Sequence, residues 1–410
     1  MRFPACIFLI FVWVADALGA TPTLRPAPRL QFPHQTDSNS PGHWDGDRLY
    51  LFNSAVQAFR SYGSNVFQLT NTVAVVFNNT ANGGRWIEAT WRAPDGTLYG
   101  WYHNEPAGLC PGTTLTAPRI GAARSTNNGA NWTDLGTVLQ TRPGTLKCTA
   151  QNGYFAGGNG DFCVMLDPAG EYLYFFFSTY AGDVTEQGVA LARMAWNDRD
   201  SPSGKVWKWD QGTWQAPGIE GTVTPLFPAM SAWERKDCDA FWGPSVHWNT
   251  RAKQYVMLLN RAKGAGWIQE GIYFSSSTNL ADPFSWSAPA KLLNGGAWYP
   301  QVMGLEPGQG TDKSADGIAR FFMGGVSDYE ISFENLAQSE GLAISRDGNA
   351  IQLSWPATLT DAHLQYSTDL SGKVWTSVTN ATMTSNGRTT TTDDVSNLQG
   401  VKYFRLQEYP

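Results

Sequence analysis

Four stretches of this chain repeat one pattern, in which a polar or acidic residue leads into a short apolar strand, a turn and an aromatic strand. They span residues 160–178, 86–102, 242–259 and 298–323. Self-similarity of this kind, with two strands in each copy, is typical of a β-propeller. A propeller directs the starts of its innermost strands toward one central funnel. Polar residues that lie far apart in the sequence are therefore expected to meet there.

The composition favours an all-β chain. Charged residues make up only 16% of the 410 residues, whereas there are 42 glycines and 23 prolines, and aromatic residues reach 13%. Such usage suits strands joined by turns. We divide the repeat region, residues 43–335, into five predicted blades, which cover residues 43–82, 85–140, 155–217, 238–294 and 296–335.

The two ends of the chain have a different texture. Residues 1–20 resemble a signal peptide, with Arg2, an apolar run over residues 7–14 and a small-residue cleavage site. We therefore expect a secreted or periplasmic protein without a membrane span. Residues 21–42 are predicted to be an extended lead-in, and residues 341–410 a small accessory β-sandwich that resembles fibronectin-III-like modules. A monomer is expected.

The cysteines suit an oxidising compartment. Four remain after removal of residues 1–20, and Cys110 and Cys148, both in loops, are the preferred disulfide pair. Cys163 lies in an apolar strand and is interpreted as a buried free thiol. Cys238 is an alternative partner for it, although we favour two free thiols. No zinc-type spacing of cysteine or histidine is present.

Acidic residues stand before or at the start of four predicted inner strands: Asp45, Glu88, Asp161 and Asp239, with Asp237 as an alternative to the last. Glycoside hydrolysis needs one carboxylic acid to protonate the leaving oxygen and one carboxylate to activate water or attack the sugar. A third carboxylate often orients the other two. The alternative is that these acids only cap turns.

Three short segments of the chain resemble parts of the five-bladed propeller glycosidases, the group of arabinanases, β-xylosidases and invertases. Residues 161–174 resemble their Asp-led strand pair, and residues 87–89 resemble the segment with their general acid. Residues 242–246 resemble a third segment, although Ser245 replaces its carboxylate. The resemblance implies that Glu88 is the general acid and Asp161 the base or nucleophile, with Asp239 or Asp45 as the third carboxylate.

The resemblance implies a carbohydrate substrate that contains arabinose, xylose or fructose. Tryptophans near the inner strands are candidates for stacking on sugar rings, and two histidines for bonding hydroxyls: Trp44, Trp86, Trp242, Trp298, His103 and His247. Core packing is the alternative for each. No cofactor is expected, although the resemblance implies a possible structural calcium ion at the funnel axis near His247. A net charge of −6 gives no reason to expect nucleic acid as a partner.

Two other functions compete with this hypothesis. Residues 125–132 match the Asp-box turn of sialidases and other propellers, and a sialidase needs three arginines around its substrate carboxylate. The available arginines are Arg48, Arg60, Arg92, Arg119 and Arg261. The other alternative is a propeller that binds glycans or proteins without catalysis.

Overall fold

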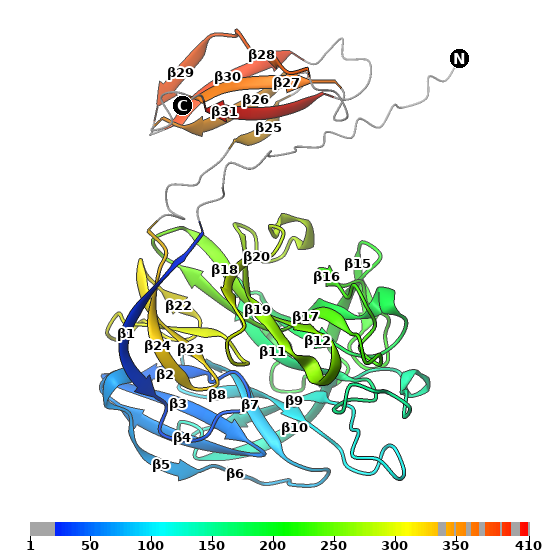
Figure 1. Cartoon of the computed structure of the whole chain (residues 1–410). Helices are drawn as coiled ribbons and strands as arrows, with labels where there is room; N and C mark the ends of the chain where they lie inside the picture. Colours follow the sequence, from blue (N-terminus) through cyan, green and yellow to red (C-terminus); the bar gives the residue numbers. More distant parts are fainter. Residues whose placement is uncertain are drawn as a thin grey trace. The chain divides into compact units, whose positions relative to one another are not determined.

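The computed structural model describes residues 21–334, 342–347, 350–357, 362–368, 374–385, 388–394 and 402–408. The predicted signal peptide lies outside these residues. The chain divides into two compact units, one of which is Thr23–Phe333 and the other mainly Glu334–Pro410. The first unit consists of five sheets that surround a common centre (Figure 1), as expected for a five-bladed propeller.

The first three blades follow one another along the chain. Blade one contains β2 (Gly42–Asp45), β3 (Arg48–Ala55), β4 (Gln57–Gly63) and β5 (Thr70–Ala74). Blade two contains β7 (Arg85–Arg92), β8 (Leu98–Asn104), β9 (Arg119–Ser125), β10 (Asn131–Leu139) and β6 (Val76–Phe77). Blade three contains β11 (Asn159–Leu166), β12 (Tyr172–Thr179), β13 (Gly188–Ala195), β14 (Val206–Asp210), β15 (Thr213–Pro217) and β16 (Phe227–Pro228).

The last two blades complete the ring. Blade four contains β17 (Asp239–Asn249), β18 (Gln254–Lys263), β19 (Gln269–Ser277), β20 (Ala290–Asn294) and the short β22 (Ser314–Ala315). Blade five contains β21 (Gln301–Gly304), β23 (Ile318–Met323), β24 (Val326–Ser332) and β1 (Thr23–Gln31). Residues 23–31, predicted to be an extended lead-in, thus form the outer strand of blade five and join the two ends of the propeller.

Single-turn 3-10 segments occur in the connections: η1 (Val66–Gln68), η2 (Pro143–Thr145), η3 (Val184–Glu186), η4 (Trp196–Asp198), η5 (Ala265–Trp267) and η6 (Pro283–Ser285). Within the described part of the chain, no helix has the length and apolar character needed to cross a membrane.

Apolar side chains fill the space between neighbouring blades. Residues such as Trp101 of β8, Phe162 of β11 and Phe175 of β12 are buried in one cluster that joins blades two and three. A second cluster, with Phe176 and Met257, joins blades three and four. Successive side chains of β12 point to opposite faces of the sheet, and both faces are buried against neighbouring blades. This explains why every residue from 174 to 177 is aromatic. This packing holds the inner strands in place around the funnel.

The Asp-box segment is a structural turn. It connects β9 and β10, where Ser125 Oγ accepts the backbone N–H of Gly129 at 2.9 Å, and Asn127 Oδ1 accepts that of Asn131 at 3.0 Å. Trp132 is buried beneath the turn. The hydrogen bonds of this turn stabilise the blade, and we assign the turn no catalytic role.

The second unit contains two antiparallel sheets. One consists of β25 (Ala343–Asp347), β26 (Ala350–Pro356), β30 (Arg388–Asp394) and β29 (Thr382–Ser385). The other consists of β28 (Thr376–Ser377), β27 (Ala362–Ser367) and β31 (Tyr403–Glu408). Buried side chains from both sheets, among them Leu353, Leu364 and Phe404, share one core. This part is therefore a β-sandwich, as predicted, whereas its fibronectin-III-like character stays a prediction.

The cysteine predictions agree with the structure. Cys110 and Cys148 form a disulfide, and Cys163 and Cys238 are both buried free thiols. The disulfide joins the loop after β8 to the loop before β11.

Candidate functional site

Two acidic residues lie at equivalent irregularities of neighbouring inner strands. Glu88 occupies the β-bulge of β7, where the pairing with β8 shifts between Ile87 and Ala89. Asp161 occupies the β-bulge of β11, where the pairing with β12 shifts between Gly160 and Phe162. A bulge leaves one residue unpaired and redirects its side chain. Asp161 also has a φ of +42°, a conformation that non-glycine residues rarely adopt outside constrained sites.

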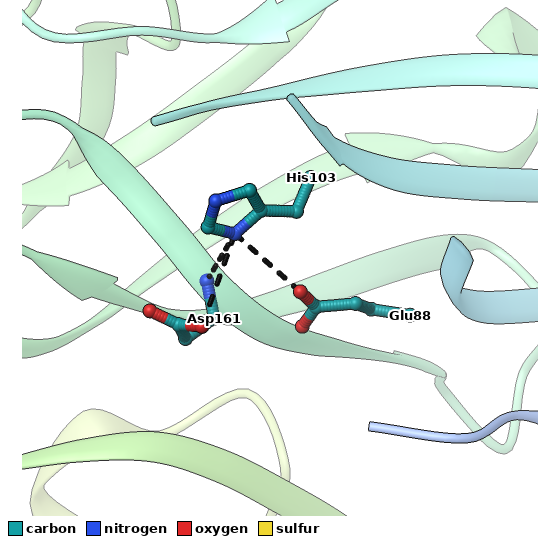
Figure 2. Close-up of side chains that lie close together, drawn as sticks. All are labelled: Glu88, His103 and Asp161. Atoms are coloured by element: carbon teal, nitrogen blue, oxygen red, sulfur yellow. Dashed lines mark hydrogen bonds and ion pairs between the residues drawn. The ribbon is translucent and has the colours of Figure 1, made fainter. Parts of the chain in front are cut away.

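His103 of β8 brings the two acids together. Its Nδ1 lies 3.4 Å from Glu88 Oε1 and 3.9 Å from Asp161 Oδ1, and it accepts the backbone N–H of Asp161 at 3.2 Å. Figure 2 shows the ring with this nitrogen turned toward both acids. On its other side, His103 Nε2 lies 3.0 Å from Glu105 Oε1. The four residues form one cluster, which we call the central cluster.

The two inner acids are almost fully buried, and each has further hydrogen bonds. Glu88 and Asp161 are both 2% exposed. Glu88 Oε2 accepts the backbone N–H of Phe162 at 2.8 Å. Asp161 accepts hydrogen bonds from the hydroxyl groups of Tyr180 and, at 3.1 Å, Tyr299. Both oxygens of Asp161 are thus engaged by tyrosines.

Burial dominates the protonation behaviour of the cluster. Burial raises the pKa of Glu88 to about 7, and the negative charge of Asp161 adds to this rise, whereas contact with His103 opposes it. Burial likewise raises the pKa of Asp161. Burial alone would lower the pKa of His103, but its contacts with Glu105 and Glu88 raise that pKa well above the usual value. The pKa values of both Glu88 and His103 are therefore raised, so this pair retains a proton at higher pH than either group would in water.

A third acid near the cluster is Asp37, which was not among the predicted residues. It precedes β2, and its backbone N–H bonds to the carbonyl of Ser54 in β3. Asp37 as a whole residue is exposed to solvent, but its carboxyl group is partly buried. This burial, together with the charges of Asp161 and Glu105, raises the pKa of the carboxyl group to about 6. Asn39, two residues later, donates to the carbonyls of Phe162 and Pro244, which anchors this segment at the centre of the propeller.

The sequence contained a usable signal for Asp37. In blade three, Asp161 leads the inner strand, and Asp167 stands in the following turn, where its backbone N–H bonds to Tyr172. In blade one, Asp45 pairs with Arg48 across the β2–β3 hairpin and thus stands at the turn. Asp45 corresponds to Asp167 by position, and the residue that leads the strand is Asp37.

The other predicted carboxylates are not part of the central cluster. Asp45 pairs with Arg92 at 2.7 Å and accepts a hydrogen bond from Asn128. Asp239 is held by Arg261 through two contacts of 2.9 and 3.1 Å at the edge of blade four. Asp237, the alternative, pairs with Arg235 on the surface. Each of the three therefore pairs with an arginine and lies outside the central cluster.

Of the four predicted tryptophans, Trp86 and Trp298 lie near the cluster or an exposed aromatic residue, whereas Trp242 and Trp44 pack in the core. Trp86 packs edge-on against His103, with ring centres 5.5 Å apart, and the partly buried Trp298 lies 5.7 Å from the exposed Tyr154. Trp242 is fully buried in the aromatic core beside Trp298, so no face of it is open to a sugar. Trp44 donates to the carbonyl of Gly310 at 2.9 Å and packs in the core between blades one and five.

His247 lies inside β17 and is fully buried. Its ring packs against Phe333, and neither ring nitrogen has a hydrogen-bond partner among the described residues. Burial lowers its pKa to about 3, and among the described residues no carboxylate offsets this effect. Calcium prefers several oxygen ligands, including carboxylates. The described surroundings of His247 therefore give the calcium hypothesis no support.

The central cluster has ligand atoms at a separation that suits a metal ion. Atoms of Glu88, His103 and Asp161 all lie within 4.8 Å of one another. However, both oxygens of Asp161 already accept tyrosine hydroxyl groups, and Glu88 Oε2 accepts the backbone N–H of Phe162. The geometry favours proton sharing over metal binding at this position.

The arginines considered for a sialidase site have other partners. Arg92 and Arg261 pair with acids outside the cluster, and Arg119 donates to Asn104. Arg48 and Arg60 lie over the rings of Tyr62 and Tyr50 in blade one. Among the described residues, these five arginines do not form the triad that a sialidase requires.

No protein-family model matches this chain, and no curated protein matches its sequence. The solved structures that it is similar to include an endo-arabinase from Bacteroides thetaiotaomicron, with 11% identity and a TM-score of 0.44 over 73% of this chain and 94% of that one. An α-L-arabinanase from Cellvibrio cellulosa shows 11% identity and a TM-score of 0.42, with 77% and 94% covered. An exo-β-1,3-galactanase from Phanerochaete chrysosporium shows 12% identity and a TM-score of 0.42, with 98% and 93% covered. Arabinanases, one of the groups that the sequence resembles, thus occur among these structures.

Proposed function

We propose that this protein is a glycoside hydrolase and that Glu88 is its general acid. The observation that carries the proposal is a pair of buried carboxyl groups at the centre of a propeller, Glu88 and Asp161, whose atoms lie within 4.8 Å of each other. Burial raises the pKa of Glu88 to about 7, so a large fraction of it is protonated near neutral pH. A carboxylic acid in this state can protonate the oxygen of a leaving sugar or alcohol.

Asp37 is the base in this proposal. Atoms of Glu88 and Asp161 lie within 4.8 Å of each other, which is less than the roughly 6.5–9.5 Å that an inverting pair needs to admit water. Asp161 is also buried and engaged by two tyrosines. It therefore acts as the third carboxylate, which orients the site and raises the pKa of Glu88. Asp37 is exposed and ionises at about pH 6, as suits a group that activates water.

Two aromatic residues are placed to contact a sugar. Tyr154 is 39% exposed and Trp298 is partly buried, and their ring centres are 5.7 Å apart. Each is next in sequence to a residue that contacts the central cluster. Tyr154 precedes Phe155, whose ring packs near His103, and Trp298 precedes Tyr299, whose hydroxyl group bonds to Asp161. We assign them to the rim of the funnel. The proposed substrates are glycans that contain arabinose, xylose or fructose, and export of the protein is part of the same proposal.

The main alternative is a propeller that binds glycans without hydrolysing them. The observation that favours it is the burial of Glu88 and Asp161, each 2% exposed, since a substrate must reach Glu88 for catalysis. In that case the rim aromatics would carry the function alone.

The deciding experiment is an activity assay of the purified mature protein on aryl glycosides and polysaccharides, with arabinan, xylan, fructan and β-1,3-galactan in the panel. Hydrolysis by the wild type that is lost in Glu88→Gln supports the proposal. Binding of a glycan by both proteins, with turnover by neither, supports the binding propeller and rejects the hydrolase.

A further inference from the structure

The two ring nitrogens of His103 face groups of opposite hydrogen-bonding character. Nε2 lies 3.0 Å from Glu105 Oε1, and an ionised carboxylate can only accept a hydrogen bond. Nδ1 lies 3.2 Å from the backbone nitrogen of Asp161, which can only donate. A neutral His103 therefore carries its proton on Nε2 and leaves a lone pair on Nδ1.

This tautomer of His103 favours one protonation state of Glu88. Glu88 Oε1 lies 3.4 Å from Nδ1. An ionised carboxylate would repel the lone pair, whereas a protonated carboxyl group can donate its proton toward it. When the ring is charged, the same proton resides on Nδ1, and the hydrogen bond from the N–H of Asp161 is then lost. In both cases one proton remains between Glu88 and His103, and it remains there because Nε2 is bonded to Glu105.

The ring has little freedom to turn away from this arrangement. A Cβ atom at Gly160 would lie 2.6 Å from His103 Cε1 and 2.7 Å from Nδ1, so the backbone of β11 supports one face of the ring closely. Trp86 packs edge-on against it, and the His103 side chain is only 4% exposed. The orientation of the ring is thus set by packing, and Glu105 selects the tautomer within it.

We propose that Glu105 is a positioning residue of the site, which fixes the tautomer of His103 and thereby keeps a proton available to Glu88. The inference rests on the proposed function for its catalytic consequence, but the tautomer itself can be observed independently. Glu105 is 30% exposed, so it remains in contact with solvent. The other titratable groups that face the pair are Asp37, Asp161, Tyr180 and Tyr299.

Glu105→Gln tests the proposal because the side-chain amide is nearly isosteric and can donate to Nε2. The neutral ring would then favour a proton on Nδ1. This proton would lie opposite the N–H of Asp161, with which it cannot form a hydrogen bond, and it would donate to an ionised Glu88. The acid would lose its proton. This resembles the loss of a catalytic tautomer when the aspartate of a serine-protease triad becomes asparagine.

The experiment combines ¹⁵N NMR of the histidine rings with kinetics. The His103 signals are assigned by their absence in His103→Asn. We expect the neutral ring of the wild type to show the Nε2–H tautomer, and the neutral ring of Glu105→Gln to show Nδ1–H. We also expect kcat to fall by about 10-fold or more with KM nearly unchanged, and Glu105→Asp to restore much of the rate. Glu171→Gln, an exposed glutamate at the far turn of the β11–β12 hairpin, is the matched control.

The outcomes separate the two proposals. A wild-type ring in the neutral Nδ1–H form overturns the inference, even if Glu105→Gln does not fold. An unchanged tautomer and rate in a folded Glu105→Gln protein also overturn it, while the hydrolase stands if Glu88→Gln is inactive. If the wild type hydrolyses no glycoside, the proposed function fails, and a tautomer change in Glu105→Gln would still establish the positioning role of Glu105 on His103.

Discussion

Phe162 donates its backbone N–H to Glu88 Oε2 at 2.8 Å, so a bulge in blade three holds the side chain of an acid from blade two. The residue before Phe162 is Asp161, whose own N–H bonds to His103 of blade two. Two consecutive amides of β11 therefore orient two side chains of the neighbouring blade. This is why the central cluster depends on the packing of whole blades and on no single loop.

The first prediction concerns Glu88. We expect Glu88→Gln to lower hydrolysis by about 10²-fold or more, because the amide cannot protonate the leaving oxygen. The loss should be smaller for aryl glycosides with acidic leaving groups, which need little protonation. Steady-state kinetics on a leaving-group series would check this. An equal loss for all leaving groups would argue against a general acid.

The second prediction distinguishes Asp37 from Asp45. We expect Asp37→Asn to lower the rate by about 10²-fold or more, since it removes the proposed base. Asp45→Asn should leave the rate within about twofold, because Asp45 pairs with Arg92 outside the site. Comparison of the two variants under one assay checks this. The reverse order of effects would reject Asp37 as the base and favour Asp45.

The third prediction concerns pH. Glu88 must be protonated, so kcat/KM should fall as the pH rises through about 7. Asp37 must be ionised, so kcat/KM should also fall as the pH drops through about 6. The profile is therefore expected to be bell-shaped, with its maximum between these values. In Asp37→Asn the acidic limb should disappear from any residual activity. A profile that is flat from pH 5 to 9 would contradict both assignments.

The fourth prediction concerns metal ions. We expect prolonged treatment with EDTA to leave activity and thermal stability unchanged, because the oxygens of Asp161 are engaged by tyrosines and, among the described residues, His247 belongs to no group of ligand atoms close enough to hold a metal. Elemental analysis of the untreated protein is the companion measurement. A stoichiometric metal together with loss of activity on its removal would overturn the proton-sharing interpretation of the cluster.

The fifth prediction concerns the disulfide. Its two cysteines are 38 residues apart, and closing a loop of this size stabilises a fold by about 2–4 kcal/mol. We expect reduction to lower the free energy of unfolding by up to that amount. The double variant Cys110→Ser/Cys148→Ser should unfold at the same lower temperature with or without reductant. Reductant sensitivity in that variant would point to another cysteine.

The sequence alone determined the blade repeat, the disulfide pair, and Glu88 and Asp161 as residues at the starts of inner strands. These features are local, because strand periodicity, turn residues and loop cysteines are legible over a few positions. The prediction named Asp45 and omitted Asp37, because the match of Asp45 to the turn residue Asp167 became clear only once the strand pairing was known.

Only the tertiary structure decided which side chains meet. The contact of His103 with Glu88 depends on the bulge in β7, and its contact with Asp161 depends on the bulge in β11 and on how blades two and three pack. The pairing of β1 with β24 likewise joins segments from opposite ends of the propeller. The pKa values of the acids follow from burial in the assembled funnel, and burial is a property of the packed blades that no single segment carries.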